Sequence, residues 1–270
     1  MSDALIQTPE FRVFSVLRQS FSILIRNFVP FGLISILILS PAYIFLYVSD
    51  PDSPVYDPFD ASMGINDVVF DSVYSILDDF LTAVLVYGVF QGIRGQPVSI
   101  FQSLSRGFRL ILPVIGVVII MGLISAAEAA LFYVMQISPS ETGEVIYSFL
   151  VIIGSVFFIY IFLILSVVVP AAVVEGHFLS SFSRSIFLTK GNRWRLLGLW
   201  VLFFLLFVIV QYLAGLIGAE IGSKSSVFLL TWAAEAMISA FGAVVFTVVY
   251  YRLRLVKDGV DENEIAAVFD

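Results

Sequence analysis

Residues 196–217 have the sequence LLGLWVLFFLLFVIVQYLAGLI, a run of 22 residues without a charged side chain. A helix of about 20 apolar residues is long enough to cross the roughly 30 Å hydrocarbon core of a bilayer. The run is apolar on all sides, whereas the strands of a membrane barrel alternate apolar and polar residues. We therefore predict a transmembrane helix here.

The composition extends this prediction to the whole chain. Of its 270 residues, 60% are hydrophobic and 13% are charged. Soluble domains carry about 25% charged residues, so this chain has too few to cover a water-soluble globule. Five further segments have the length and polarity of a span: residues 29–48, 69–93, 110–135, 145–174 and 227–251. The predicted fold is an all-α integral membrane protein with six transmembrane helices in a single domain.

Basic side chains mark one side of the membrane. Lys and Arg occur before the first span, between the second and third, between the fourth and fifth, and after the sixth, and Lys224 is the one exception. Cytoplasmic loops carry the excess of Lys and Arg, so the basic side is predicted to be cytoplasmic. An even number of spans then places the N-terminus and the C-terminus both in the cytoplasm.

Short amphipathic segments precede the odd-numbered spans. Before the first span, Phe14, Phe21 and Phe28 lie on an apolar stripe, with polar residues opposite. Similar stripes that include Phe101 and Phe182 precede the third and fifth spans. Each segment is expected to form an interfacial helix with its apolar face toward the lipid.

Each even-numbered span also reaches a glycine just past the membrane, at Gly95, Gly176 and Gly259. We predict three repeats of interfacial helix, span, outer loop and span, over residues 11–95, 98–176 and 177–259. A short cytoplasmic tail at residues 255–270 follows.

Glycines and prolines within the spans suggest how the helices pack. The pairs Gly88–Gly92 and Gly218–Gly222 have the four-residue spacing of close helix packing, which we expect to occur inside the chain. Pro41 and Pro170 predict kinks in the first and fourth spans.

Two stretches carry a family resemblance. Residues 167–197, VVVPAAVVEGHFLSSFSRSIFLTKGNRWRLL, and the ending YYRLRLVKDGVDENEIAAVFD resemble the membrane domain found fused to some bacterial glycerophosphoryl diester phosphodiesterases, and the related stand-alone inner-membrane proteins of the YciC type. The matching features are Glu175-Gly176, Ser183-Arg184-Ser185, Leu188-Thr189 and Gly191-Asn192-Arg193-Trp194. The resemblance implies a helical domain of the bacterial inner membrane. It does not imply a phosphodiesterase, because the catalytic domain of those proteins is a separate soluble barrel.

Acidic residues inside the predicted spans are the first candidate site. Ionisable groups are costly in the bilayer and mark function by default, and no basic residue in the spans is available to pair with them. The candidates are Asp78, Asp79, Glu128 and Glu235. One interpretation is an outward-facing acidic cavity for a cation, a proton or a cationic group. The other is a structural role at the hydrated outer interface.

Charged residues around the third interfacial helix are the second candidate site. They are Glu175, Arg184, Lys190, Arg193 and Arg195. One interpretation is recognition of an anionic lipid headgroup, with Arg184 and Arg193 binding phosphate. The other is a Glu175–Arg184 ion pair that fixes the turn between span and interfacial helix. His177 is expected to be a solvated side chain on the polar face.

The residue inventory limits the function classes. The chain has no cysteine and one histidine, which argues against a metal site, and no nucleotide-binding or hydrolase motif is present. We expect no enzyme and no cofactor. The favoured function is a non-catalytic, lipid-interacting scaffold, regulator or assembly module. The alternative is a transporter or lipid-handling protein. Expected partners are anionic membrane lipids and a possible membrane protein, with no nucleic acid.

The absence of cysteine makes the topology directly testable. In spheroplasts, a membrane-impermeant maleimide should label S53C and S140C, and it should label S2C, S105C and A266C only after permeabilisation. Ser105 and Ser140 flank the predicted third span, so comparing S105C with S140C tests whether that span crosses the membrane. Labelling of both from the same side would contradict six spans.

Overall fold

The computed structural model describes residues 11–49, 65–109, 115–124, 126–127 and 141–259. These ranges are almost entirely helical and contain no strand. Five helices are long and apolar enough to cross a membrane: α2 (Phe28–Ser49), α3 (Ile65–Ile93), the segment Ile152–Glu175, α9 (Arg193–Glu220) and α10 (Lys224–Asp258). The chain is therefore a helical membrane protein.

The predicted third span differs from the other five. Of residues 110–135, the described part is a short apolar helix at Ile115–Ile124 and residues 126–127. A Cβ atom on Gly122 would lie 2.4 Å from the Ile76 side chain, and one on Gly116 would lie 2.7 Å from Phe178. This short helix therefore packs closely against α3 and against α8 (Phe178–Thr189).

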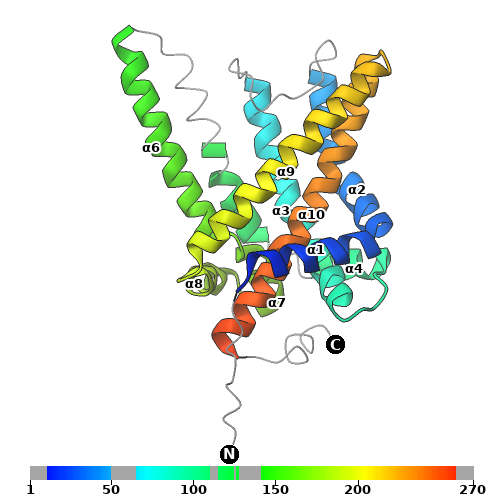
Figure 1. The fold of residues 1–270 in the computed structure, drawn as a ribbon, viewed down its shortest axis with the longest axis vertical. Helices are drawn as coiled ribbons and strands as arrows, with labels where there is room; N and C mark the ends of the chain where they lie inside the picture. Colours follow the sequence, from blue (N-terminus) through cyan, green and yellow to red (C-terminus); the bar gives the residue numbers. More distant parts are fainter. Residues whose placement is uncertain (1–10, 50–64, 110–114, 125, 128–140, 260–270) are drawn as a thin grey trace, which may run out of the picture.

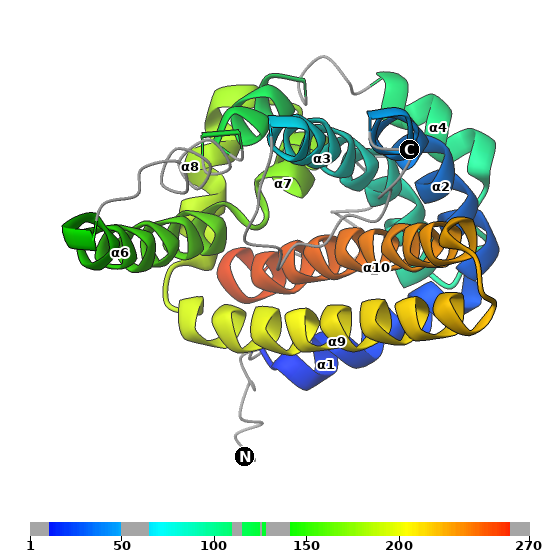
Figure 2. The same cartoon turned by 90° about the horizontal axis from the view of Figure 1, so that it is seen from above.

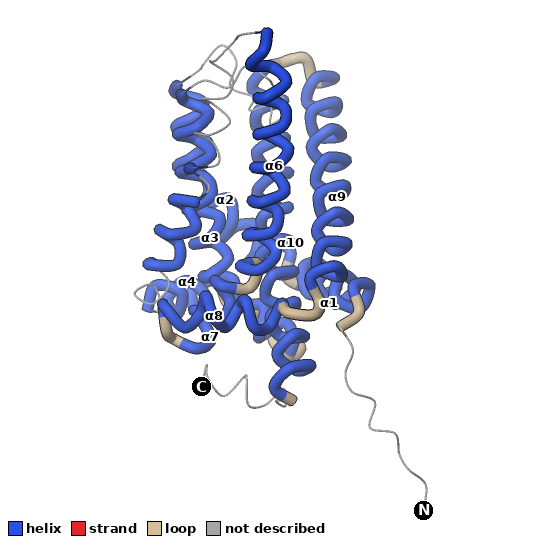
Figure 3. Tube along the Cα trace, turned by 90° about the vertical axis from the view of Figure 1, so that its left-hand side faces the viewer, coloured by secondary structure: helices blue, strands red, loops and turns tan. Residues whose placement is uncertain are grey.

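Three short helices gather at one end of the long ones (Figures 1 and 3). They are α1 (Val13–Arg26), α4 (Ile100–Arg109) and α8. We call this the basic end, because Arg18 and Arg184 lie on these helices. On α1 the side chains of Val16, Ser20 and Ile23 are buried, while Phe14 is 78% exposed. The side chains of Phe101 on α4 and Leu179 on α8 are similarly exposed, at 80% and 77%. Such exposed apolar faces fit helices that rest on lipid.

The longest helix, α10, is the centre of the bundle. It packs against α9, α3, α1 and α2, and Figure 2 shows it between α9 and α3. Its buried face is rich in small side chains: Ala236, Ser239, Ala240, Gly242 and Ala243. Small residues allow helix backbones to approach closely within a membrane. By contrast, α9 exposes Val201, Phe204 and Leu205 among others, as a lipid-facing helix would.

The fourth predicted span is broken in two. It forms α6 (Glu141–Leu165) and α7 (Val168–Glu175), and Pro170 lies in the first turn of α7, where proline is tolerated. In α2 the helix continues through Pro41. Proline has no N–H to donate to the carbonyl oxygen of Leu37, and the hydroxyl of Ser40 donates to that oxygen instead, at 2.9 Å.

The three glycines that follow the even-numbered spans share one conformation. Gly95, Gly176 and Gly259 have φ angles of 70°, 70° and 64°. This left-handed conformation ends a helix without the steric cost that a Cβ would add. Gly191 and Gly222 are also left-handed, with φ angles of 87° and 84°.

The glycine pairs have different roles. A Cβ on Gly92 would lie 2.7 Å from Ile23 of α1, and one on Gly88 would lie 3.0 Å from Phe31 of α2, so this pair packs α3 against its neighbours. Gly218 approaches the backbone of Val227 across the α9–α10 turn, while Gly222 forms that turn with φ 84°.

Gly218 and Gly215 provide a matched test of the α9–α10 turn. A Cβ at Gly218 would lie 2.5 Å from the Cα of Val227, while one at Gly215 meets nothing within 4 Å. We expect G218A to lower the unfolding free energy by about 1–3 kcal/mol. G215A should be neutral, or stabilising by up to about 1 kcal/mol. Thermal unfolding in one detergent measures both, and equal midpoints would contradict this packing.

Candidate functional site

A polar cluster lies between α3, α9 and α10. The Tyr74 hydroxyl donates to Oε1 of Glu235 at 2.8 Å, and the Gln211 amide donates to Oε2 of the same carboxylate. The Tyr74 oxygen also lies 2.6 Å from the hydroxyl of Ser239. Asp78 lies near Tyr74 and Glu235, and its buried Oδ1 has no hydrogen-bond partner among the described residues. We call these five residues the intramembrane cluster.

The cluster includes two of the four predicted intramembrane acids. Asp78 and Glu235 converge on it, from α3 and α10. Asp79 is the next residue on α3, and neither Asp78 nor Asp79 takes part in the three hydrogen-bond contacts described above. Glu128 lies outside the described residues. Glu235 is 11 residues beyond the start of α10, about 16 Å along the helix.

Aromatic rings cover the side of the cluster that faces α2. Tyr43 packs edge-on against Phe70 and Tyr74, with ring centroids 5.5 Å and 6.2 Å away. Phe228 and Trp232 of α10 extend this packing. Tyr43, Phe70 and Phe228 are each at most 8% exposed. The polar groups are thus enclosed by rings on this side.

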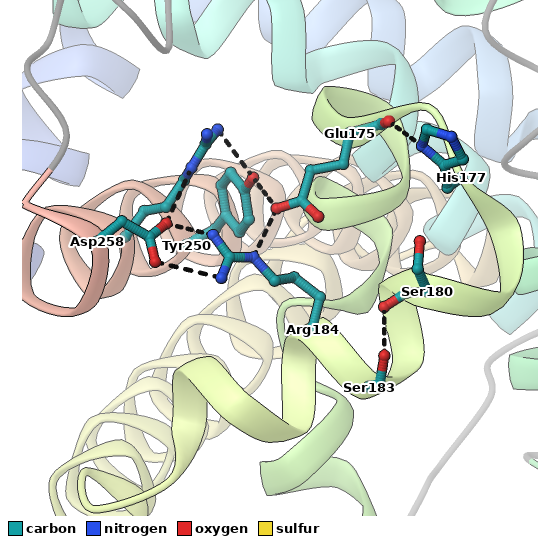
Figure 4. A network of polar contacts seen from close by, with 8 residues as sticks. Glu175, His177, Ser180, Ser183, Arg184, Tyr250 and Asp258 are labelled. Carbon is teal, nitrogen blue, oxygen red and sulfur yellow. Dashed lines mark hydrogen bonds and ion pairs between the residues drawn. The ribbon is translucent and has the colours of Figure 1, made fainter.

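A second polar network lies at the basic end, where α7, α8 and α10 meet (Figure 4). The Arg184 guanidinium donates to Oε1 of Glu175 at 2.7 Å and also to both oxygens of Asp258. The Tyr250 hydroxyl donates to Oε1 of Glu175 at 3.1 Å. Arg254 adds a hydrogen bond to Tyr250 at 3.3 Å and an ion pair with Asp258 at 3.4 Å.

This network holds the turn between the fourth span and α8. Partial burial opposes the charge of Arg184, but its hydrogen bonds with Asp258 and Glu175 raise the pKa of the guanidinium above its ordinary value. The predicted Glu175–Arg184 ion pair is confirmed. The guanidinium of Arg184 therefore already binds the carboxylates of Glu175 and Asp258. Its second partner, Asp258, belongs to the segment assigned from the sequence to the tail, but α10 continues through it.

The other predicted residues of the basic end do not converge with Arg184. Arg193 donates to the Tyr160 hydroxyl at 2.7 Å and stacks over that ring, and Arg195 donates to the carbonyl of Phe11 at 3.1 Å. Lys190 is exposed. The exposed ring of His177 contacts the carbonyl of Glu175 through Nδ1 at 2.6 Å.

An apolar groove lies between α1 and α9, and the sequence alone did not indicate it. Its volume is about 560 Å³, within the usual 300–1,000 Å³ range of ligand pockets. Arg18 and Ser22 are the polar residues of its lining. The apolar residues of the lining are Phe14, Leu17, Phe21, Ile25, Leu202, Phe203, Leu206 and Phe241. The phenylalanine stripe of α1 was visible in the sequence, but its partner residues on α9 and α10 lie about 180–220 positions away.

No cluster of metal-ligating side chains occurs among the described residues. A scan of protein-family models and searches of curated proteins and solved structures returned no match to this chain.

The Glu175–Arg184 pair can be tested by a double-mutant cycle. Both side chains are about three-quarters buried, and a hydrogen bond to a charged group contributes about 1.5–3 kcal/mol. We expect E175Q and R184M each to lower thermal stability in detergent, with a coupling energy of about 0.5–3 kcal/mol between them. K190Q, which removes an exposed charge on the same segment, is the control and should be neutral. Additive effects of E175Q and R184M would show that the pair is not coupled.

Proposed function

We propose that this chain is a non-catalytic, lipid-interacting module of a bacterial inner membrane. In this proposal it has six spans in three repeats, with both termini in the cytoplasm. The groove between α1 and α9, with Arg18 beside it, is the observation that carries the proposal. Its occupant is a membrane phospholipid, with an acyl chain along the groove and the phosphate at Arg18.

The chemistry of the groove fits a lipid better than a polar metabolite. Phe14, Phe21 and Leu206 offer apolar surface along its length, and Arg18 is the single charged residue of its lining. An anionic group on an otherwise apolar molecule matches that pattern. A guanidinium recognises phosphate through paired N–H donors.

Arg18 is available for such a contact. It is exposed and has no ion-pair or hydrogen-bond partner in the described part of the chain, in contrast to Arg184, Arg193 and Arg195. Arg18 therefore replaces Arg184 as the residue that we assign to the headgroup.

Contacts between α1 and α10 form the groove without a bound lipid. Oε1 of Gln19 on α1 accepts hydrogen bonds from Nε and Nη2 of Arg252 on α10, at 2.9 and 2.7 Å. Val16 and Ser20 of α1 are fully buried against the bundle. This attachment fixes the rotation of α1, so that its phenylalanine side chains project beside α9. A preformed site loses less entropy on binding.

Two observations support the three repeats of this proposal. The placement of α1, α4 and α8 at one end and the shared left-handed glycines fit three equivalent units (Figure 1). We propose the bacterial localisation on the basis of the sequence resemblance, and the cytoplasmic orientation of the termini on the basis of the distribution of Lys and Arg.

A second candidate function is a transporter coupled to a proton or a cation. The convergence of Asp78 and Glu235 favours it, because carboxylates without basic partners inside a span are typical of ion-coupled pathways.

Native mass spectrometry of the protein released gently from its own membrane tests the lipid proposal. We expect a phospholipid to be retained by the wild type. One Arg near an anionic headgroup contributes about 1 kcal/mol, so R18Q should weaken retention by about fivefold. R26Q is the matched control, since Arg26 is also exposed on α1 but does not line the groove.

A second pair of variants tests the groove itself. L206W fills it and should displace the lipid, while L205W adds the same bulk to the lipid-facing side of α9, where Leu205 is 51% exposed, and should not. Equal retention in L206W and L205W would exclude the groove as the binding site. A co-purifying protein without lipid would favour the assembly-module function instead.

A further inference from the structure

The start of α9 has backbone donors without acceptors. This helix begins beside α8 at the basic end (Figure 1), and its first backbone hydrogen bond runs from the Leu196 N–H to the Asn192 carbonyl, at 2.9 Å. The N–H groups of residues 193–195 therefore have no acceptor within the helix. Such a helix end carries a partial positive charge and attracts anions. Every helix has such an end, so the side chains around this one decide whether it binds a ligand.

Asn192 is a buried polar residue whose side chain has no partner. As the N-cap residue of α9 it lies directly beside these N–H groups, and it is 9% exposed. An asparagine at this position usually accepts a hydrogen bond from the first turn of its own helix. Here that capping bond is absent, and the Asn192 side chain makes no other hydrogen bond within the described part of the chain. Its amide is therefore available to a ligand at the helix end.

Arg193, the first residue of α9, has an unused pair of donors. Its Nη1 donates to the Tyr160 hydroxyl of α6 at 2.7 Å, and the guanidinium stacks over that ring, 5.2 Å from the centroid. Its Nε is buried and has no hydrogen-bond partner among the described residues. Nε and Nη2 share one edge of the guanidinium, and paired N–H donors on one edge match two oxygens of a phosphate group. Tyr160 thus positions Arg193 through Nη1 and leaves this edge without an acceptor.

The charges around the start of α9 favour an anion. Lys190 is exposed, and neither Lys190 nor Arg193 forms an ion pair within the ranges that the structure describes. Arg195 adds a further positive charge in the first turn of the helix. Residues 176–219 contain no Asp or Glu. The segment therefore carries positive charge that no carboxylate of its own neutralises.

We propose that Lys190, Asn192 and Arg193 form, with the first turn of α9, a binding site for a phosphate group. Two phosphate oxygens accept from Nε and Nη2 of Arg193, and another accepts from the helix N–H groups and the Asn192 amide. Lys190 adds charge from the solvent side. The site is separate from the groove, because Leu202, the first groove residue on α9, lies nine residues after Arg193, about 14 Å along the helix. Phospholipid headgroups and soluble phosphate esters both carry the group that this site recognises.

Two titrations of the full chain in a phosphate-free maltoside detergent test the site. Native mass spectrometry with added phosphatidylglycerol measures binding of a lipid headgroup, in an R18Q background that weakens the groove. Phosphorus NMR line broadening of inorganic phosphate measures binding of the soluble ion. We expect binding in at least one titration, and R193Q should weaken it by about tenfold or more, because it removes charge-assisted hydrogen bonds. N192A should weaken it by about fivefold. R26Q is the matched control, since it removes one exposed charge from α1, and it should leave binding unchanged.

Further variants separate the paired donors of Arg193 from its charge. R193K keeps the charge but lacks the planar fork, so it should bind more weakly than the wild type and more tightly than R193Q. N192A removes a side chain that makes no hydrogen bond, so the test holds even where R193Q fails to fold. Binding in the lipid titration alone supports the site and identifies a headgroup as its ligand, whereas binding of inorganic phosphate supports it and identifies a soluble ligand. Absence of binding in both titrations, or equal affinities of the wild type, R193Q and N192A, would overturn the site.

Discussion

Close packing around α10 is the constraint on which the other contacts depend. Helices inside a bilayer gain little from hydrophobic association with one another, because lipid tails are as apolar as leucine side chains, so they rely on tight contact and on interhelical hydrogen bonds. The small buried residues of α10, such as Ala240 and Gly242, bring α3 and α9 close. That proximity allows one carboxylate, Glu235, to bond simultaneously to Tyr74 and Gln211.

At the basic end, α10 acts differently, through long polar side chains. Arg252 holds α1 through Gln19, and Asp258 holds α8 through Arg184. Arg254 and Tyr250 complete the contact with Glu175 at the end of α7. One helix therefore positions the short helices at this end, and the groove beside Arg18 exists because α1 is fixed in rotation.

Hydropathy and local spacing predicted much of this structure, but not the contacts between distant segments. Five of the six predicted spans correspond to long apolar helices, because apolar length is readable locally. Glu175–Arg184 was predictable because both residues flank one turn. Asp258 was not, since it lies 74 positions from Arg184. Of the neighbouring acids Asp78 and Asp79, the sequence did not show which one meets α10, because that choice depends on the rotation of α3, about 100° per residue. The groove escaped prediction for the same reason, since it needs two faces from opposite ends of the chain.

The groove and the intramembrane cluster share α9. Leu202, Phe203 and Leu206 line the groove, and Gln211, little more than a turn further along, binds Glu235. α9 is also the most lipid-exposed of the spanning helices, so fewer contacts resist its displacement than resist displacement of α10. In the proposed function, a lipid that displaces α9 would change the distance from Gln211 to Glu235. Thermodynamic linkage would then require the reverse effect of equal size, in which loss of the Gln211–Glu235 hydrogen bond changes the affinity for the lipid.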